Sequence, residues 1–122
     1  MVTPSAQRVR IIAGRFRGRV IRFPRVPGVR PTPDRVRETV FNWLGQDLSG
    51  WRCLDAFAGS GALGFEAASR NAAQVVLLER DRALAQGLKE AQQRLAAVSL
   101  RVENVAAMAW MARCEPGAFE LI

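Results

Sequence analysis

The sequence has no histidine, one lysine, two cysteines and no long apolar segment. The absence of histidine excludes catalysis by imidazole and zinc sites with histidine ligands within this chain. Cys53 and Cys114 lack the spacing of a metal site, so we expect no bound metal and a free, buried thiol at Cys53. No apolar run approaches about 20 residues, the length that spans a membrane, and the first five residues lack the apolar core of a signal peptide. We therefore expect a cytoplasmic protein that does not enter a membrane.

Positive charge is concentrated at the start of the chain. Residues 1–37 contain ten arginines and one acidic residue, a net charge of +9, whereas residues 38–122 contain eight basic and ten acidic residues, a net charge of −2. Strand-like runs at 9–12 and 19–23 flank two glycines and predict a β-hairpin, with arginines 15, 17, 19 and 22 around its turn and one side. Arginine binds phosphate and stacks on bases, so the pattern favours an RNA-contacting hairpin over a solvated basic face. The RNA-contacting residues predicted here are Arg10, Arg15, Phe16, Arg17 and Arg19, with Phe16 as the stacking side chain.

The rest of the chain is organised around the stretch LDAFAGSGALG at 54–64. Its pattern predicts a strand, a tight glycine turn and a helix. Glycines at 59, 61 and 64 permit positive φ and the close approach of a ligand. The helix that follows points free N–H groups toward that ligand. Such an element suits a nucleotide-like cofactor.

Two acidic residues bear on the choice of cofactor. Asp55 ends the strand, and a negative charge there repels a diphosphate and suits a cation such as the sulfonium of S-adenosylmethionine. Glu79 ends the next apolar run, where a carboxylate can accept both ribose hydroxyls. The spacing G-x-G-x-x-G by itself leaves an NAD-type domain open, and Asp55 argues against that alternative. The simplest alternative is that Asp55 only caps the turn or the helix.

Apolar strands alternate with helices through the remainder of the chain. After an irregular loop at 24–31, we expect an amphipathic helix at 33–46 that is capped by Thr32 and has Val36 on its apolar face. Strands are expected at 51–56, 74–79, 99–103 and 119–122, and helices at 62–70, 81–97 and 106–113. Val98 is expected on the apolar stripe of the helix at 81–97. The alternation predicts an α/β fold with a parallel sheet and right-handed crossovers.

Three stretches, in the same order, carry a resemblance to a known family: RIIAGRFRGR at 10–19, RPTPDRVRETVFNWL at 30–44 and DAFAGSGALG at 55–64. The third is similar to the first motif of class I S-adenosylmethionine-dependent methyltransferases. Together they resemble the ribosomal RNA small subunit methyltransferase D family, which methylates the N2 amine of a guanine in 16S rRNA. The resemblance runs from about Arg8 to Ile122. It implies an α/β, Rossmann-like class I methyltransferase fold, of which this chain would contain the first four parallel strands. A basic N-terminal β-hairpin and a helix would precede this partial fold.

The resemblance also implies cofactor, partners and site residues. The cofactor would be S-adenosylmethionine, and the partner 16S rRNA or the assembling small ribosomal subunit, with a monomeric full-length protein. Residues 1–32 would form the basic arm and hairpin, and residues 33–122 the cofactor-binding part. The implied cofactor-binding residues are Thr32, Asp55, Phe57, Ala58, Gly59, Ser60, Gly61, Glu79, Arg80 and Asn104. Arg30 and Arg37 join the RNA-contacting residues, and Asp34 would lie near cofactor or substrate.

The sequence departs from the family pattern in two places. The polar residue that meets the adenine amine in the family falls on Ala106, so Asn104 or a backbone group is expected to replace it. The catalytic motif, Asn or Asp followed by Pro-Pro and an aromatic residue, is expected beyond Ile122, so no catalytic residue is assigned within the chain. Its fourth strand would then be an uncovered apolar edge beside the first. We expect this chain alone to be marginally stable, prone to aggregation and inactive. The alternative to a methyltransferase is a non-catalytic RNA-binding module that retains the fold.

Overall fold

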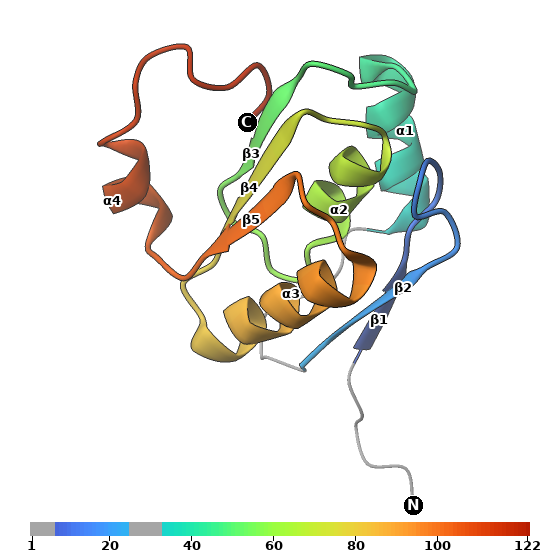
Figure 1. Ribbon diagram of the computed structural model, residues 1–122, viewed down its shortest axis with the longest axis horizontal. Coiled ribbons are helices and arrows are strands. Elements are labelled where there is room, and N and C mark those ends of the chain that lie inside the picture. The colour runs from blue at the N-terminus through green and yellow to red at the C-terminus, as the bar shows by residue number, and fades with distance from the viewer. Residues whose placement is uncertain (1–6, 25–32) are drawn as a thin grey trace, which may run out of the picture.

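A basic hairpin precedes an α/β unit in the computed structural model, which describes residues 7–24 and 33–122 (Figure 1). Strands β1 (Gln7–Arg10) and β2 (Val20–Phe23) pair antiparallel. The hairpin expected from the sequence is thereby confirmed. Thr32 and Arg30, assigned above to cofactor and RNA, lie outside the described residues.

Three parallel strands form the central sheet, in the order β3 (Arg52–Asp55), β4 (Gln74–Leu78) and β5 (Leu100–Glu103). Helix α2 (Ala62–Ser69) connects β3 to β4, and helix α3 (Arg82–Leu95) connects β4 to β5. Helix α1 (Asp34–Leu44) precedes the sheet, and the short helix α4 (Ala107–Met111) follows it. The predicted parallel sheet and its alternation with helices are confirmed.

Both faces of the sheet are covered, because successive side chains of a strand point to opposite sides. Val75 and Leu77 of β4 belong to the larger core, with residues of α2, α3, α1 and the hairpin. Val76 and Leu78 belong to a smaller core with Ala107 of α4. In Figure 1, α2 and α3 accordingly lie on one side of the sheet and α4 on the other. The N-terminal hairpin therefore packs on the helical layer that carries the glycine loop.

Some expectations about the helices are wrong. Helix α1 begins at Asp34, with Pro33 in the capping position, and ends at Leu44, two residues before the predicted end. Thr32, the predicted cap, lies outside the described residues. Val36 is 48% exposed, on the outward side of α1. Val98 is 84% exposed because α3 ends at Leu95 and the left-handed Ala96, with φ 53°, turns the chain away.

The segment at 119–122 only begins a strand. Leu121 forms an isolated parallel bridge with Cys53, and its carbonyl accepts the Leu54 N–H at 2.9 Å. The bridge places this segment beside β3, on the side away from β4, as the resemblance implies for the fourth strand. Cys53 is buried with a free thiol, and burial raises its pKa to about 11.

Candidate cofactor site and nucleic-acid interface

The glycine loop leaves β3 at Asp55 and enters α2 at Ala62. Gly59 and Gly61 have φ values of 55° and 83°, in the left-handed region that favours glycine. A Cβ on Gly61 would also lie 2.6 Å from Leu88 Cδ2, so a larger residue at this position would have to displace that side chain.

The start of helix α2 is fixed against the sheet by a close approach. A Cβ on Gly64 would lie 2.0 Å from Leu77 Cδ2 of β4, a separation that real Cβ atoms do not reach. Helix and strand therefore pack directly at this point. Gly61 and Gly64 thus allow close packing against side chains inside the protein. Gly59 instead donates its N–H to the carboxylate of Glu79.

Glu79 follows the last residue of β4 and holds the loop. Its Oε1 accepts the Gly59 N–H at 2.9 Å, and its Oε2 accepts the Asp81 N–H at 2.7 Å. The Ala58 N–H donates to the Leu78 carbonyl at 3.0 Å, which ties the loop to the same strand. The structure thus brings Glu79 to the glycine loop, as the strand pattern predicts, and its role toward a cofactor stays a prediction.

Asp55 places a second carboxyl group at the neighbouring strand end. Burial raises its pKa to about 6, and the charge of Glu79 acts in the same direction. Hydrogen bonds from the backbone of Phe57 and Gly64 oppose this shift. Through these hydrogen bonds Asp55 caps the loop and the first turn of α2. A desolvated carboxylate beside a second one also favours binding of a cation over binding of a phosphate.

The other predicted cofactor residues differ in exposure. Phe57 is 79% exposed, whereas Ala58 and Ser60 are buried. Asn104 Nδ2 donates to the carbonyls of Glu79 and Arg80 at 2.9 and 3.0 Å, which joins the ends of β4 and β5. These bonds leave the carbonyl oxygen of the Asn104 amide for a ligand.

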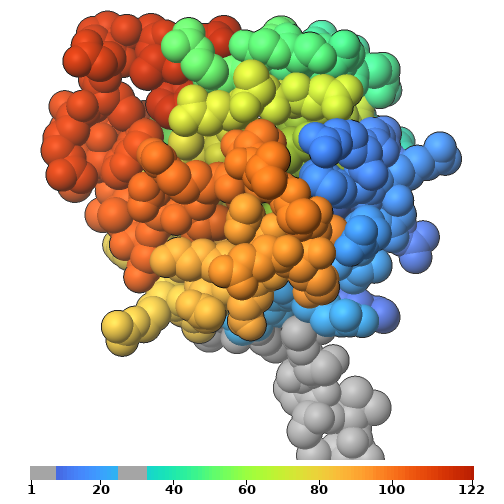
Figure 2. Space-filling view, in the orientation of Figure 1, coloured from blue at the N-terminus to red at the C-terminus, as the bar shows by residue number. Residues whose placement is uncertain are grey.

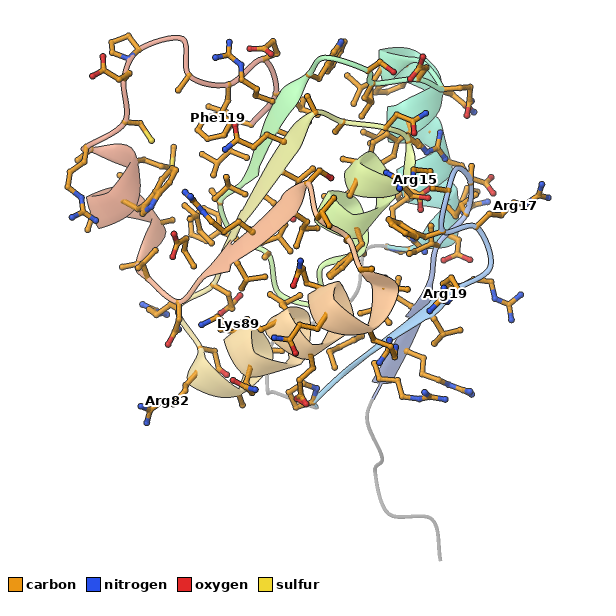
Figure 3. The ribbon with its side chains drawn as sticks, in the orientation of Figure 1. Arg15, Arg17, Arg19, Arg82, Lys89 and Phe119 are labelled. Carbon is orange, nitrogen blue, oxygen red and sulfur yellow. The ribbon has the colours of Figure 1, made fainter. Side chains whose placement is uncertain are left out.

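The hairpin turn presents Arg15, Arg17 and Arg19 to solvent. Figure 3 shows Arg17 pointing away from the body of the molecule. Gly18, with φ 81°, donates its N–H to the Ile11 carbonyl, while Ile11 donates to Arg19, so the turn closes on a β-bulge. These three arginines are accessible to a nucleic acid.

Two residues predicted to contact RNA are buried. Phe16 is 9% exposed and packs in the larger core, so its assignment as a stacking side chain is wrong. Arg37 is 1% exposed and is paired with Asp34 and with Glu66 Oε1, the latter at 3.2 Å. It also donates to the Arg10 carbonyl at 2.9 Å, so its guanidinium stabilises the fold instead of binding RNA. Arg10 itself is exposed.

Glu66 of α2 is the residue that sequence reasoning missed. It is fully buried and accepts the N–H groups of Ile12 and Ala13 at 2.9 and 3.0 Å. The Arg70 guanidinium donates to its other side at 3.0 Å. The signal in the sequence is a single acid inside the otherwise apolar run of α2, which requires buried partners.

Ser69, one turn further along α2, holds the hairpin turn at a second point. Its Oγ accepts the Phe16 N–H at 2.9 Å and donates to the Ala13 carbonyl at 2.5 Å. The Ser69 carbonyl accepts the Arg15 N–H at 2.8 Å. A Cβ on Gly14 would lie 2.0 Å from that carbonyl oxygen, so the turn and the helix approach too closely for any other residue.

An apolar hollow of about 480 Å³ extends from the end of β3 toward α1 and α4. Cys53, Leu54 and Leu121 line it, with the exposed Phe57 and Met108 at its edge. Among residues 7–24 and 33–122, no group of three or more His, Cys, Asp or Glu side chains is placed to hold a metal ion. In the same residues, no helix is long and apolar enough to cross a membrane.

The parallel sheet, the glycine loop and the two strand-end carboxyl groups define part of a Rossmann-like fold of the kind found in methyltransferases. Two solved structures to which the chain is similar are described as members of that class. A putative methyltransferase from Escherichia coli is 48% identical, with a TM-score of 0.79, and the match covers 87% of this chain and 57% of that one. A putative methylase from Haemophilus influenzae is 41% identical, with a TM-score of 0.71, covering 90% and 58%.

The chain belongs to the family described as conserved hypothetical protein 95, whose sequence model matches residues 9–122. A relative from E. coli strain K12, named ribosomal RNA small subunit methyltransferase D, is 52% identical over 105 residues, which are 86% of this chain and 53% of the relative. The H. influenzae protein of the same name is 51% identical over 104 residues, 84% and 54% of the two chains. The chain therefore spans about half the length of these relatives.

Proposed function

We propose that this chain is the cofactor-binding half of an S-adenosylmethionine-dependent methyltransferase that modifies the N2 amine of a guanine in 16S rRNA. The observation that carries the proposal is the pair of carboxyl groups, Asp55 and Glu79, at adjacent strand ends around the glycine loop. Relatives named rRNA methyltransferases support the class of reaction and the class of substrate.

The cofactor supplies a methyl group made electrophilic by the sulfonium. The Asp55 carboxylate attracts its positive charge, and the negative strand ends disfavour the diphosphate of NAD. Loop 57–61 and the Asn104 amide oxygen complete the binding set, with Glu79 holding the loop in shape. Ala106, at the cap of α4, has no polar side-chain atom, so adenine recognition falls to Asn104 or to backbone groups.

Methyl transfer itself needs a hydrogen-bond acceptor that orients the guanine amine. The family's motif for this role, Asn or Asp followed by Pro-Pro and an aromatic residue, does not occur in these 122 residues. We assign the role to a part of the parent protein that corresponds to the unmatched portion of its relatives. The acceptor would orient the amine, whose lone pair is delocalised into the ring, toward the methyl group. The guanine must be unpaired or flipped out to reach such a pocket.

Calorimetric titration of the chain with S-adenosylmethionine, and separately with NAD, tests the cofactor assignment. We expect saturable binding of the sulfonium ligand, weakened at least about thirtyfold in Asp55→Asn because a charged contact is lost. Affinity should also fall as the pH is lowered through about 6, where Asp55 takes up a proton. Asp47→Asn, an exposed carboxylate away from the loop, is the matched control.

Two results would contradict the assignment. Tight binding of NAD would show that the glycine loop holds a diphosphate. A folded chain that binds RNA and neither cofactor would favour the RNA-binding module without catalysis.

A further inference from the structure

The outward face of the hairpin carries Arg8, Arg10 and Arg22, which we call the hairpin face. All three are exposed, whereas Val9 and Ile21, which alternate with them, are 4% and 0% exposed in the core. Residues 7–24 contain six arginines and no acidic residue. Within the described residues, no ion pair is formed by the hairpin face. Its positive charge is therefore directed to solvent.

Strand register places two of these arginines directly opposite each other. Arg8 pairs with Arg22 across the hairpin, two residues from the pair of Arg10 with Val20. The Ile11 N–H donates to the Arg19 carbonyl, and the alternation of an antiparallel ladder from there makes Arg8 and Arg22 a non-hydrogen-bonded pair. Such pairs bring side chains closest together, and like charges directly opposite destabilise a sheet. The register thus places two like-charged side chains directly opposite each other on the outward face of the hairpin.

The hairpin face has no exposed aromatic side chain among the described residues. Both phenylalanines of the hairpin, Phe16 and Phe23, are buried at 9% and 2% exposure. A groove lies between β2 and α3, and Arg22 is one of the residues that line it. On the α3 side it is lined by Arg94, whose Nη2 donates to the Val20 carbonyl at 2.7 Å, and by Glu90, the one acidic residue among those that line it. Arginine contacts both phosphates and bases, but binding of bases in single strands also uses stacking on aromatic rings. A face of arginines without an exposed ring therefore favours phosphates.

We propose that the hairpin face is a phosphate-binding surface that holds rRNA without reading its sequence. The inference rests on the proposed function and adds the chemistry of its RNA contact. A polyanion between Arg8 and Arg22 would turn their mutual repulsion into two attractive contacts. The hairpin would contribute affinity and orientation, and the choice of guanine would be made elsewhere in the parent protein.

The test compares the double variant Arg8→Gln/Arg22→Gln with the control Arg101→Gln/Arg113→Gln, which removes the same charge from exposed positions outside the hairpin. Each is titrated, over a range of salt, with a 16S rRNA fragment and with an unrelated RNA of equal length. We expect the hairpin variant to bind both RNAs about tenfold more weakly and its log–log salt slope to fall by about 1.4, for two lost phosphate contacts. The control should change neither quantity by a comparable amount.

Stability gives a second, independent readout. Removing the opposed charges should leave the melting temperature unchanged or raise it by about 1–4 °C, although RNA binding falls. A lower melting temperature in the hairpin variant would overturn the inference, because the two arginines would then support the fold.

Other outcomes also overturn the proposal. Equal RNA affinity in the hairpin and control variants would remove this face from the interface. Loss of binding to the rRNA fragment only would show that the face reads bases. Unchanged binding to free RNA with loss of binding to a small-subunit particle would make the partner a protein. S-adenosylmethionine binding is measured on the same samples. Its absence in the wild type would contradict the proposed cofactor site and leave the RNA result standing.

Discussion

At the scale of one residue, Asp55 is a buried carboxyl group whose charged form lowers the stability of the fold. Its pKa of about 6 lies above the ordinary value of 3.8, chiefly because the carboxyl is desolvated. The folded chain therefore holds this proton more tightly than the unfolded chain does. The stability that Asp55 contributes is fully present below about pH 4 and is lost as the pH rises through about 6.

Asp55→Asn should therefore stabilise the chain at neutral pH while it weakens cofactor binding. We expect a gain of about 1–3 kcal/mol at pH 7.5, because a desolvated charge is removed, and little gain at pH 4, where the group is already neutral. Urea unfolding at the two pH values measures the difference.

Asp47→Asn is the control for this titration. The pKa of exposed Asp47 is lowered by its hydrogen bonds with Ser49, so its neutral replacement should not stabilise the chain at pH 7.5. An equal gain in Asp55→Asn at both pH values would contradict the assigned cause.

At the scale of one element, helix α2 joins the two parts of the proposed site. Its first residue follows Gly61 of the glycine loop, and its second half holds the hairpin turn through Glu66 and Ser69. Eight residues of helix span only about 12 Å. Gly64 fixes the helix against β4, so the position of the hairpin is set relative to the cofactor loop.

Glu66→Gln should loosen the hairpin from α2. The amide keeps the shape but leaves Arg37 and Arg70 without their buried counter-charge, which costs about 3–5 kcal/mol. Hydrogen exchange at the Ile12 and Ala13 amides, both bonded to Glu66, should accelerate before that of the β4 amides.

Glu38→Gln, an exposed acid on α1, is the matched control and should change stability by less than about 0.5 kcal/mol. Slow exchange at Ile12 and Ala13 in Glu66→Gln would show that Ser69 and the apolar contacts hold the hairpin by themselves.

At the scale of the whole molecule, the sheet is unevenly covered. Among the described residues, one face is buried under α2, α3 and the hairpin, and the other under the short α4 and the segment that follows it. Figure 2 shows this C-terminal segment, in red, on the side of the molecule opposite the hairpin, in blue. The apolar hollow beside β3 ends at the exposed side chains of Phe57, Met108 and Ile122. Contiguous exposed apolar surface of this kind promotes association.

The 122-residue chain should consequently bind a hydrophobic dye and associate at raised concentration. Met108→Lys with Ile122→Lys should reduce both effects, measured by dye fluorescence and sedimentation. Val98→Lys changes an equally exposed apolar residue outside the hollow and should have little effect. Equal dye binding and association in all three proteins would show that the hollow is not the surface involved.

The sequence by itself determined the order and type of the elements. Short apolar runs between helical segments predicted the three parallel strands, and glycines 59, 61 and 64 with Asp55 and Glu79 placed the loop and its carboxyl groups. These signals are local, because strand alternation and positive φ act within a few residues of the chain. The basic hairpin was equally visible, since β-strands and their turn are close in sequence.

Tertiary structure alone decided which charged residues stay in solvent. Arg37 and Arg10 are both arginines of the same basic segment, yet one is buried against Glu66 and the other faces outward. Burial of Arg37 depends on an acid 29 positions away, and that of Phe16 on the contact with Ser69, 53 positions away. The opposed pair of Arg8 and Arg22 likewise follows from strand register. A side chain's surroundings are set by packing between elements, and one sequence does not state them.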